Sequence, residues 1–572
     1  MKCLSYSFIT TVLYYTSCTL GYDLTIMHTN HIHAHFEEFD SNGLTCSEDE
    51  STYNECFGGI ARRLTKVNEI RAEQTNPILL DGGDHFQGTQ WFTYYKGNAS
   101  AHFMNRIEYD AMAPSNHEFD YGTFVLADFL KKVEFPVVSC NIDITETPEL
   151  DGLFTDSVIL NIGGDDVGIV GYTTTRTHLI SAPGDFQITD EITALKIEVE
   201  KLTNQGINKI IALGTSGLDK EMEIAREVPG IDVIIGADHH HFLYTGVPPT
   251  NAEDVTGPYP TVVRPNNNEI VLIVQTINYG KYLGLLQLTF DDDGKITNYE
   301  GNPVLLDSSV EQDPETLTEV EEWAVPVRAL GEVVVGSTYA LLDGENPTCR
   351  AGECNLGSFI ADALLSEHIE FQGDDGWSDV SISMINSGAI RASISPGEIK
   401  GDDVTTIIPY ANSVNLVELR GHHLLEVLER SVEEYDLVIL PGFFLQYSGL
   451  VVTYDVTQPV GSRVVSVMVR CALCEIPRYE KLETERIYKI VMPSYLAEGG
   501  DGFDMIPEHL LSRISGRQDS DVINEYLTKL SPIAPGVEGR IIIIGDESSS
   551  TILTTSSMLL VTFATIVCQI IF

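Results

Sequence analysis

Basic residues are scarce in this chain of 572 residues, which has 34 Lys and Arg against 84 Asp and Glu and a formal charge of −50. A partner made of nucleic acid needs a basic face that neutralises phosphates, so this composition argues against a nucleic acid polymer. An anionic substrate has to be held by locally placed arginine or by a metal, against the field of the whole chain. The acidic surplus itself is typical of a highly soluble secreted protein.

Internal repeats and long low-complexity tracts are also missing from the chain. The length is therefore divided among globular domains, and at least two are expected in 572 residues. The apolar fraction of 43% is ordinary for such domains.

Long apolar runs are confined to the two ends of the chain. Residues 1–20 combine a basic start, an apolar stretch and small or polar residues, which predicts a secretory signal peptide. Residues 549–572 begin with small serines, continue with a mostly polar spacer and end in an apolar tail, the pattern of a GPI-anchor propeptide. A transmembrane helix is the alternative, but an apolar stretch of 15 residues is short for one. The ends predict an extracellular protein at the cell surface, attached to the plasma membrane through a GPI anchor.

Cysteine is infrequent too, and seven of the ten cysteines lie between these end segments. An oxidising compartment favours disulfide bonds between cysteines that are close in sequence. The predicted pairs are Cys46 with Cys56, Cys349 with Cys354 and Cys471 with Cys474. Cys140 is left over, and we expect a buried free thiol there rather than a reactive one. The sequon that begins at Asn98 predicts a glycoprotein.

The pattern of apolar residues over the first 300 positions alternates between short buried strands and amphipathic helices. Helices are expected from about residue 59 to 72 and from about 191 to 204, each with one apolar face. Strands are expected at 24–27, 78–80, 136–139, 167–170, 210–213 and 233–235. This alternation predicts a layered α/β domain, with ligands bound beyond the carboxyl ends of the strands.

The predicted organisation has a first α/β domain at residues 22–310, a linker helix at 311–332 and a second α/β domain at 333–545. Four polar segments follow predicted strands of the first domain, and each brings Asp, Asn or His to a strand end. They are 28–33, 81–84, 115–120 and 236–241. Such a cluster predicts a metal site at the open edge of a sheet. His31 and His33 are expected on one face of an extended chain, because side chains alternate with period two.

With these segments, further motifs make the chain similar to the ecto-5′-nucleotidase family of the calcineurin-like metallophosphoesterase superfamily. The motifs are Gln87-Gly-Thr, Phe242-Leu-Tyr-Thr-Gly246, Cys349-Arg350, Asn386-Ser-Gly-Ala-Ile-Arg391 and Ala497-Glu-Gly-Gly-Asp-Gly-Phe503. The resemblance covers nearly the whole mature chain. It implies a metallophosphoesterase domain, a bridging helix and a nucleotide-binding domain through which two copies form a homodimer. It also implies hydrolysis of nucleoside 5′-monophosphates, typically AMP, at a two-zinc site.

The resemblance assigns roles to individual residues. His33, Asp84 and Asn116 match metal ligands, and His117 and Asp120 match the catalytic positions. The substrate-binding positions are Arg350, Asn386, Arg391, Tyr410, Tyr495 and Asp501. Arginine suits phosphate, paired aromatic rings suit a purine, and a carboxylate suits the two ribose hydroxyls.

The metal ligands depart from the family pattern at three positions. His31 stands where the family has Asp, and Thr215 and Asp238 stand where it has His; His240 falls where family members carry Asn or His. One position would then be bound by His31, His33, Asp84 and His240, a nitrogen-rich set that suits zinc. The other would have Asp84, Asn116 and Asp238 with only a weak hydroxyl at Thr215, so its ion (Zn, Mn or Mg) is expected to be weak or absent.

The function expected from the sequence is therefore a 5′-nucleotidase-like, metal-dependent phosphohydrolase with an altered and weakened dimetal site. Two alternatives stay open at this point. The first is a catalytically impaired pseudoenzyme that binds nucleotides at the cell surface. The second is an apyrase-like hydrolase that acts on ATP or ADP.

Overall fold

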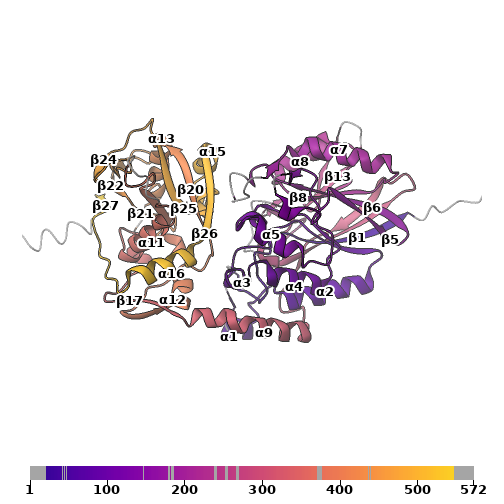
Figure 1. Ribbon diagram of the computed structural model, residues 1–572, viewed down its shortest axis with the longest axis horizontal. Helices are drawn as coiled ribbons and strands as arrows, with labels where there is room; N and C mark the ends of the chain where they lie inside the picture. The colour runs from indigo at the N-terminus through magenta and orange to yellow at the C-terminus, as the bar shows by residue number, and fades with distance from the viewer. Residues whose placement is uncertain are drawn as a thin grey trace, which may run out of the picture.

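The computed structural model describes residues 21–545 apart from 42, 44, 47, 146, 178–180, 182–185, 238–240, 251–254, 266–268, 370–375, 436 and 438–439. The predicted signal peptide and GPI-anchor segment lie outside the described residues, and so do Asp238 and His240. The described chain forms two domains that lie side by side and are joined along one edge by a helix (Figure 1). This two-domain α/β architecture confirms the predicted fold class.

The N-terminal domain contains two sheets packed face to face. The first sheet has the strand order β15-β14-β1-β2-β3, and β1, β2 and β3 run parallel. Its strands are β1 (Tyr22–Thr29), β2 (Pro77–Asp81), β3 (Ala111–Met112), β14 (Tyr282–Phe290) and β15 (Ile296–Gly301), and β16 (Val304–Leu305) pairs with β14. The parallel strands matter for function because their carboxyl ends lie at one edge of the sheet.

The second sheet has the strand order β12-β13-β9-β8-β6-β5, with four parallel strands between antiparallel edges. Its strands are β5 (Ser157–Ile162), β6 (Asp165–Thr173), β8 (Ile210–Thr215), β9 (Val233–Ile235), β12 (Thr261–Val263) and β13 (Val271–Val274). Side chains of both sheets, such as Ile26 and Ile78 from the first and Ile211 and Leu272 from the second, form one buried core between them. Burial on both faces is the reason why these strands are nearly continuous apolar runs.

Helices cover the outer faces of this sandwich. On the first sheet lie α2 (Ile60–Glu73), α4 (Gly97–Ile107) and α5 (Gly122–Leu130), and on the second lie α7 (Glu191–Asn204) and α8 (Leu218–Glu227) (Figure 1). The apolar stripe of α2 buries Leu64, Val67 and Ile70, as its periodicity predicts. Shorter elements of the domain are α1 (Glu48–Thr52), α3 (Gln90–Tyr95), β4 (Ile142–Asp143), β7 (Gln187–Ile188), β10 (Phe242–Leu243) and β11 (Val255–Gly257), with 3₁₀ turns at Asn116–Phe119, Pro148–Leu150 and Asn278–Gly280.

Five of the six predicted strand segments lie within strands of the two sheets. The strand predicted at 136–139 is wrong, because Val137 and Val138 make only isolated bridges, to Met112 and Thr155 respectively. The segment is apolar and extended, but Pro136 has no N–H to donate to a longer ladder.

Helix α9 (Pro314–Gly331) connects the domains and is fastened to both. On the N-terminal side Trp323 packs against the core of the first sheet, and Arg328 pairs with Glu37 at 2.6 Å. On the C-terminal side Gly331 lies close to the carboxylate of Asp402. The domains also touch directly, since the Gln90 amide donates a hydrogen bond to the Thr405 hydroxyl at 2.7 Å.

The C-terminal domain contains a sheet of strand order β21-β18-β25-β20-β26 beside a second sheet of order β24-β23-β22-β27. The first comprises β18 (Ile382–Asn386), β20 (Ser413–Arg420), β21 (Leu445–Ser448), β25 (Ile487–Pro493) and β26 (Ser512–Gln518). The second comprises β22 (Leu450–Asp455), β23 (Val464–Arg470), β24 (Tyr479–Lys481) and β27 (Ile541–Ile544), and β17 (Val334–Thr338) pairs with β19 (Gly397–Lys400). The helices are α10 (Asn346–Cys349), α11 (Asn355–Ser366), α12 (Gly401–Ile407), α13 (Gly421–Ser431), α14 (Ser494–Ala497), α15 (Met505–His509) and α16 (Asp519–Leu530), with 3₁₀ turns at Ser387–Ala389 and Gly500–Gly502.

The predicted cysteine pairs are disulfide-bonded in the structure: Cys46 with Cys56, Cys349 with Cys354 and Cys471 with Cys474. Among the described cysteines, Cys140 is a half-buried free thiol. Burial raises the pKa of this thiol to about 12, which agrees with the expectation that it is unreactive. The sequon residue Asn98 lies in the first turn of α4 with a partly exposed side chain.

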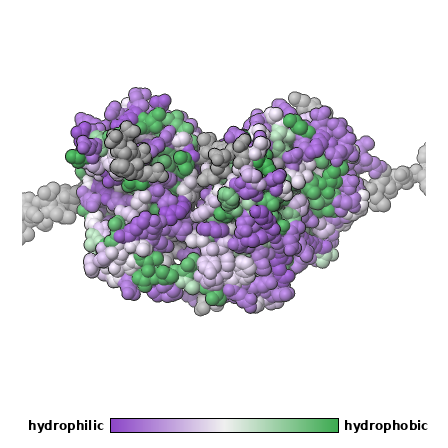
Figure 2. Space-filling model, viewed as in Figure 1, coloured by the Kyte–Doolittle hydropathy of each residue, from purple (hydrophilic) through white to green (hydrophobic). Residues whose placement is uncertain are grey.

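The visible surface is largely hydrophilic, with small scattered hydrophobic patches and a notch between the two domains (Figure 2). Within the described part of the chain, every helix is too short or too polar to cross a bilayer.

A sharp turn at Gly83 brings the chain from β2 into the site. Gly83 has φ of 96°, a conformation that disfavours any side chain. A Cβ there would also lie 2.7 Å from the Cβ and the backbone nitrogen of Ser115. The turn therefore lets two strand-end loops approach one another.

We expect Gly83→Ala to lower the free energy of unfolding by at least about 3 kcal/mol, because the cost of a side chain on a left-handed backbone is added to the cost of the steric overlap. Gly152→Ala is the matched control: Gly152 has φ of 72°, but no atom outside its own segment lies within 4 Å of the added Cβ. The control should cost only about 1 kcal/mol. Calorimetric unfolding of both variants checks this, and equal losses would contradict the steric account.

Candidate functional site

Three parallel strands of the first sheet end at the same edge and deliver the site residues. β1 is followed by His31 and His33, β2 by Asp84, and β3 by Asn116 and His117. The loops that carry them are joined by backbone hydrogen bonds: the His31 and His33 nitrogens donate to the carbonyls of Gly83 and Asp84 at 2.9 Å. The convergence expected from the sequence is therefore present for these residues.

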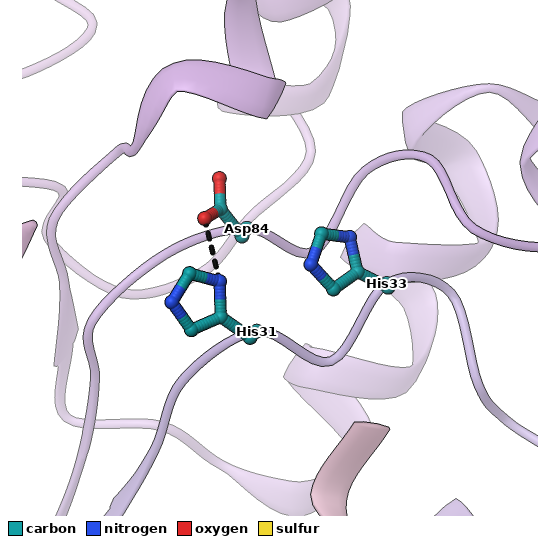
Figure 3. Close-up of side chains that lie close together, drawn as sticks. All are labelled: His31, His33 and Asp84. Atoms are coloured by element: carbon teal, nitrogen blue, oxygen red, sulfur yellow. Dashed lines mark ion pairs between the residues drawn. The ribbon is translucent and has the colours of Figure 1, made fainter. Parts of the chain in front are cut away.

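His31, His33 and Asp84 form the centre of the candidate metal site (Figure 3). Their ligand atoms all lie within 4.8 Å of one another, and the three residues are buried. His31 Nδ1 lies 2.7 Å from Asp84 Oδ2, and the two imidazole rings stack with centroids 5.6 Å apart. Two nitrogens and one carboxylate oxygen at this spacing fit a transition-metal ion.

The local backbone differs from the expected extended chain. His31 and His33 have φ of 53° and 51°, so both are left-handed. Alternation with period two therefore does not explain why they lie together, and the prediction of an extended segment is wrong. The strain persists because hydrogen bonds to the Asp84 loop fix the turn, a common situation at functional sites.

The orientation of the His33 ring is set by an outer contact. Its Nδ1 lies 3.2 Å from the backbone carbonyl of Phe86. A protonated Nδ1 that donates to this carbonyl leaves Nε2 as the ligand atom, the arrangement that second-sphere carbonyls commonly impose on metal-binding histidines.

Glu118 joins the loop after β2 to the loop after β3, a role that was not predicted from the sequence. Its carboxylate is fully buried. It accepts hydrogen bonds from four backbone N–H groups, those of Asp84 at 2.9 Å, His85 at 2.7 Å, Phe86 at 3.2 Å and Ser115 at 2.8 Å. The signal that could have found it is the capping box formed with Ser115. Burial raises the pKa of Glu118, and the neighbouring Asp84 adds to this shift.

The charges around Asp84 favour its ionised form. Burial by itself raises the pKa of Asp84, but His117, His31 and His33 outweigh it and hold the pKa well below its usual range. Asp84 Oδ1 also accepts a hydrogen bond from the His117 backbone nitrogen at 3.1 Å. An ionised carboxylate with histidines around it is ready to bind a cation.

His117 and Asp120 form a dyad at the side of this centre. His117 Nδ1 lies 2.6 Å from Asp120 Oδ2, and the Ser181 hydroxyl donates to Asp120 Oδ1 at 2.6 Å. Burial by itself lowers the pKa of His117, but Asp120 and Asp84 raise it to about 10. A cation bound nearby would oppose this rise. The dyad is therefore built to carry a proton beside the metal centre.

The second metal position is only partly within the described residues. Asn116 is buried, and its Oδ1 accepts from the Ser115 hydroxyl at 3.2 Å. Thr215, at the end of β8, is fully buried and donates its hydroxyl to the Gly82 carbonyl at 2.8 Å. Asp238 and His240 lie outside the described residues, so the structure does not place these two predicted ligands.

A pocket of about 370 Å³ opens beside the metal centre and lies between the domains. His33, Gln87 and His117 line it from the N-terminal domain, and Tyr410 and Tyr495 line it from the C-terminal domain. Both amide atoms of Gln87 are buried and make no hydrogen bond within the described residues. From the sequence, Gln87 is only the first residue of the Gln87-Gly-Thr motif. Its buried amide without a hydrogen bond indicates a contact with a bound molecule.

The predicted substrate residues of the C-terminal domain gather around Asp501. The Tyr495 hydroxyl donates to Asp501 Oδ1 and the Asn386 amide to Oδ2, both at 2.9 Å. The Arg391 guanidinium lies 6.0 Å from the centre of the Tyr410 ring. Arg350, Asn386, Arg391 and Asp501 do not line the pocket itself, which Tyr410 and Tyr495 enter from the same domain.

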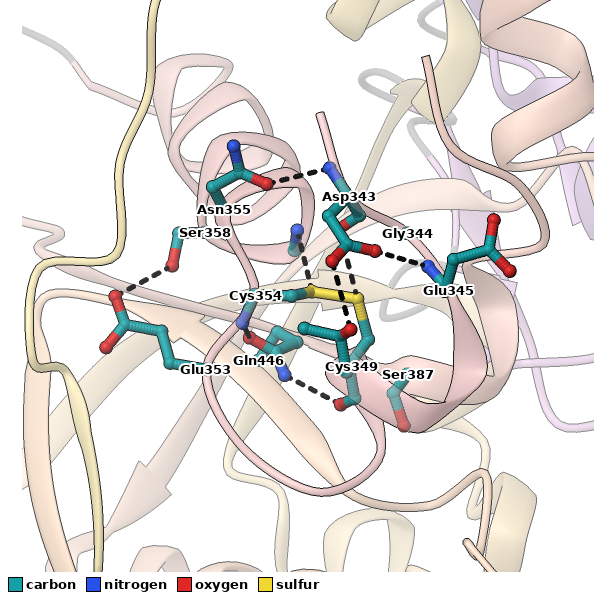
Figure 4. The surroundings of a disulfide bond; sticks show 12 residues. Asp343, Gly344, Glu345, Cys349, Glu353, Cys354, Asn355, Ser358, Ser387 and Gln446 are labelled. Carbon is teal, nitrogen blue, oxygen red and sulfur yellow. Dashed lines mark hydrogen bonds between the residues drawn. A yellow bond between two sulfur atoms is a disulfide. The ribbon is translucent and has the colours of Figure 1, made fainter. Parts of the chain in front are cut away.

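Arg350 belongs to the short loop that is closed by the disulfide between Cys349 and Cys354. Figure 4 shows the surroundings of this disulfide. Gln446 fills this loop: its amide donates to the Cys349 carbonyl at 2.8 Å and accepts from the Cys354 nitrogen at 3.1 Å. Burial lowers the pKa of Arg350, and the nearby Arg391 guanidinium adds to the shift. Two arginines this close create a local site for an anion in an acidic protein.

The two domains match known families. Residues 24–242 match the calcineurin-like phosphoesterase family, and residues 334–508 match the 5′-nucleotidase C-terminal domain. Fold and site thus define a metallophosphoesterase, an enzyme that uses divalent metal ions to hydrolyse phosphoric monoesters.

Similar proteins narrow this class. The chain is 42% identical over 538 residues to a 5′-nucleotidase of Diplobatis ommata, covering 93% of this chain and 91% of that one. It is 42% identical over 528 residues to a mouse 5′-nucleotidase, covering 91% and 90%. The crystal structure of a 5′-nucleotidase precursor from Thermus thermophilus has a TM-score of 0.62 and 36% identity, covering 92% and 100%. The chain belongs to the 5′-nucleotidase family and is a nucleotide phosphohydrolase.

We expect Glu118→Gln to reduce metal affinity about 10- to 100-fold, as is typical for loss of an outer-sphere partner. The amide has a single acceptor oxygen, and its NH₂ group would face backbone N–H groups. Metal analysis at fixed free zinc checks this. Glu108→Gln is the control, because that glutamate side chain is 84% exposed; equal metal content in the two variants would contradict a positioning role for Glu118.

Proposed function

We propose that the protein hydrolyses nucleoside 5′-monophosphates, with AMP as the expected substrate, to a nucleoside and phosphate. The observation that carries the proposal is the pocket in which Tyr410 and Tyr495 face His33 and His117 across the domain boundary. A nucleotide has an aromatic base at one end and an anionic phosphate at the other. This pocket offers aromatic rings at one end and a metal centre at the other.

The base and ribose would be held by the C-terminal domain. Tyr410 and Tyr495 present two rings between which a purine can stack. Asp501 has both carboxylate oxygens in hydrogen bonds to Tyr495 and Asn386, which orients it as an acceptor for two neighbouring hydroxyl groups. Arg350 and Arg391 supply the positive charge that a nucleotide needs in a chain of charge −50.

The phosphate would lie at the strand ends of the N-terminal domain. When bound, divalent ions neutralise the phosphoryl oxygens and activate a water for attack. His117 stands beside this position and, with its pKa raised by Asp120, donates a hydrogen bond or proton to the developing charge. The Gln87 amide, which makes no hydrogen bond within the described residues, lines the same pocket and would contact the phosphate.

The metal content is proposed to be unequal at the two positions. His31, His33 and Asp84, completed by His240, would hold one transition-metal ion, with zinc as the expected ion. The second position would have Asp84, Asn116 and Asp238. The Thr215 hydroxyl is already engaged with the Gly82 carbonyl, which supports the view that it is a poor ligand. The second ion (Zn, Mn or Mg) would be weakly held or absent.

Of the functions considered, hydrolysis of monophosphates has the best support. A pseudoenzyme that only binds nucleotides would have no use for the buried network of Glu118 behind the metal loops or for the dyad of His117 and Asp120. Apyrase-like cleavage of ATP or ADP needs the same metal centre and has no separate observation in its favour.

The cellular setting is proposed from the sequence. Residues 1–20 would be a signal peptide and 549–572 a GPI-anchor propeptide, so that the enzyme works at the outer face of the plasma membrane. The disulfide bonds support an oxidising compartment. The proposed limits are 22–310 for the phosphoesterase domain, 311–332 for the linker and 333–545 for the nucleotide-binding domain, through which two copies would form a homodimer.

Metal analysis and an AMP assay on the purified ectodomain test the ligand exchange. Restoring the family ligands with His31→Asp, Thr215→His and Asp238→His should add about one zinc per chain and raise turnover at least about tenfold, since ~1.4 kcal/mol is tenfold in rate. Asp84→Ala should remove about one zinc from the natural chain and about two from the reverted one.

Loss of two zinc ions from the natural chain on Asp84→Ala would contradict the proposal of a weak second position. Turnover that is absent from the natural chain with zinc, manganese and magnesium, and restored by the reversion, would instead show a pseudoenzyme.

Stacking on Tyr495 is tested by a pair of variants. Tyr495→Leu should raise KM for AMP about 5- to 150-fold, because stacking of a base on an aromatic ring contributes about 1–3 kcal/mol. Tyr495→Phe keeps the ring but loses the hydrogen bonds to Asp501, so its KM should rise less. The control Tyr339→Leu changes a remote tyrosine that is 76% exposed. An unchanged KM in Tyr495→Leu would rule out the stacking role.

A further inference from the structure

A second group of candidate metal-binding side chains lies on α13 and α15 of the C-terminal domain, and none of them lines the pocket. His422, His423 and Glu426 are on α13, and His509 is the last residue of α15. The two helices lie near one another at one end of the domain (Figure 1). These residues take no part in the proposed hydrolysis.

The side chains of this group lie close together in the structure. The ligand atoms of His423, Glu426 and His509 all lie within 4.8 Å of one another. The rings of His423 and His509 stack with centroids 3.9 Å apart and planes 20° from parallel, and the His422 ring lies 4.0 Å from that of His423. Glu426 Oε2 lies 2.9 Å from His423 Nδ1.

The spacing of these residues in the sequence explains the cluster. His423 and Glu426 are three residues apart, so they lie on one face of α13. His509 comes from another helix, so the group bridges two elements. The His422 ring is oriented by its Nδ1, which lies 3.1 Å from the Thr484 carbonyl. Glu426 and His509 are exposed, which leaves a path for an ion from solvent.

We propose that His423, Glu426 and His509 bind a divalent transition-metal ion such as zinc. Two imidazoles and one carboxylate are a ligand set that zinc takes in proteins, whereas magnesium and calcium prefer oxygen. The ion would link α13 to α15 on the surface of the C-terminal domain.

The link would act close to the nucleotide residues. Arg430, on the same helix as His423, donates two hydrogen bonds to the backbone carbonyl of Asp501, at 3.2 and 2.9 Å. α15 begins shortly after Asp501 in the chain. A metal ion at this site would therefore fasten together the two helices that flank the Asp501 turn.

The test compares zinc bound by the ectodomain and by the double variant His423→Asn and His509→Asn at the same free zinc concentration. Both chains have identical catalytic residues, so ions at the catalytic site cancel in the difference. We expect the double variant to bind about one zinc less per chain. Zinc should also raise the unfolding temperature of the natural chain more than that of the double variant. His102→Asn is the control, because that histidine pairs with Glu319 at 3.8 Å and stacks on Trp323 but belongs to none of the metal-binding groups among the described residues.

Equal zinc content in the natural chain and the double variant would overturn the proposal, whatever the AMP assay shows. Should the double variant fail to fold, Glu426→Gln alone serves, because this glutamate side chain is 53% exposed. It should weaken zinc binding and shift the d–d absorption spectrum of the cobalt-loaded protein, and an unchanged spectrum would count against the site. A result in which only the His102 variant loses zinc would equally contradict it.

Discussion

The hydrogen bonds to the Glu118 carboxylate are the interaction on which the rest of the site depends. One buried side chain gathers backbone N–H groups from the loop after β2 and from the loop after β3. Without it these groups would be buried and unsatisfied, at a cost of about 1–3 kcal/mol each. Asp84 and His117 keep their relative positions because the backbones that carry them share this acceptor.

Much of the fold could be predicted from residue patterns. The strands that become β1, β2, β6, β8 and β9 are buried on both faces, which leaves a plain apolar signature. The convergence of His31, Asp84 and Asn116 followed from parallel strands that end at one edge. The left-handed backbone of His31 and His33 could not be predicted, because it is imposed by hydrogen bonds from a loop more than fifty residues away. The role of Glu118 could be predicted only in part: the capping box marks its bond to Ser115, but its partners in the loop after β2 are backbone atoms that leave no signal in the sequence.

The proposed exchange of ligands would redistribute charge within one site. In that proposal, nitrogen donors bind at one metal position, with His31 and His33, and oxygen donors at the other, with Asn116 and Asp238. Asp84 is shared and is held ionised by the histidines around it. Under that proposal, the identity of each ion would be decided by the type of donor at its position.

The disulfide between Cys349 and Cys354 couples the position of Arg350 to the redox state of its surroundings. Arg350 lies inside the small ring that this bond closes. Apart from the disulfide, the ring is held by hydrogen bonds to Gln446, by the Tyr435 hydroxyl, which donates to the Ala351 carbonyl, and by the Arg350 guanidinium, which donates to the Leu440 carbonyl. Reduction of this bond would leave the loop to its hydrogen bonds alone, and Arg350 would gain conformational freedom. The covalent bond thus makes the position of Arg350 depend on an oxidising environment.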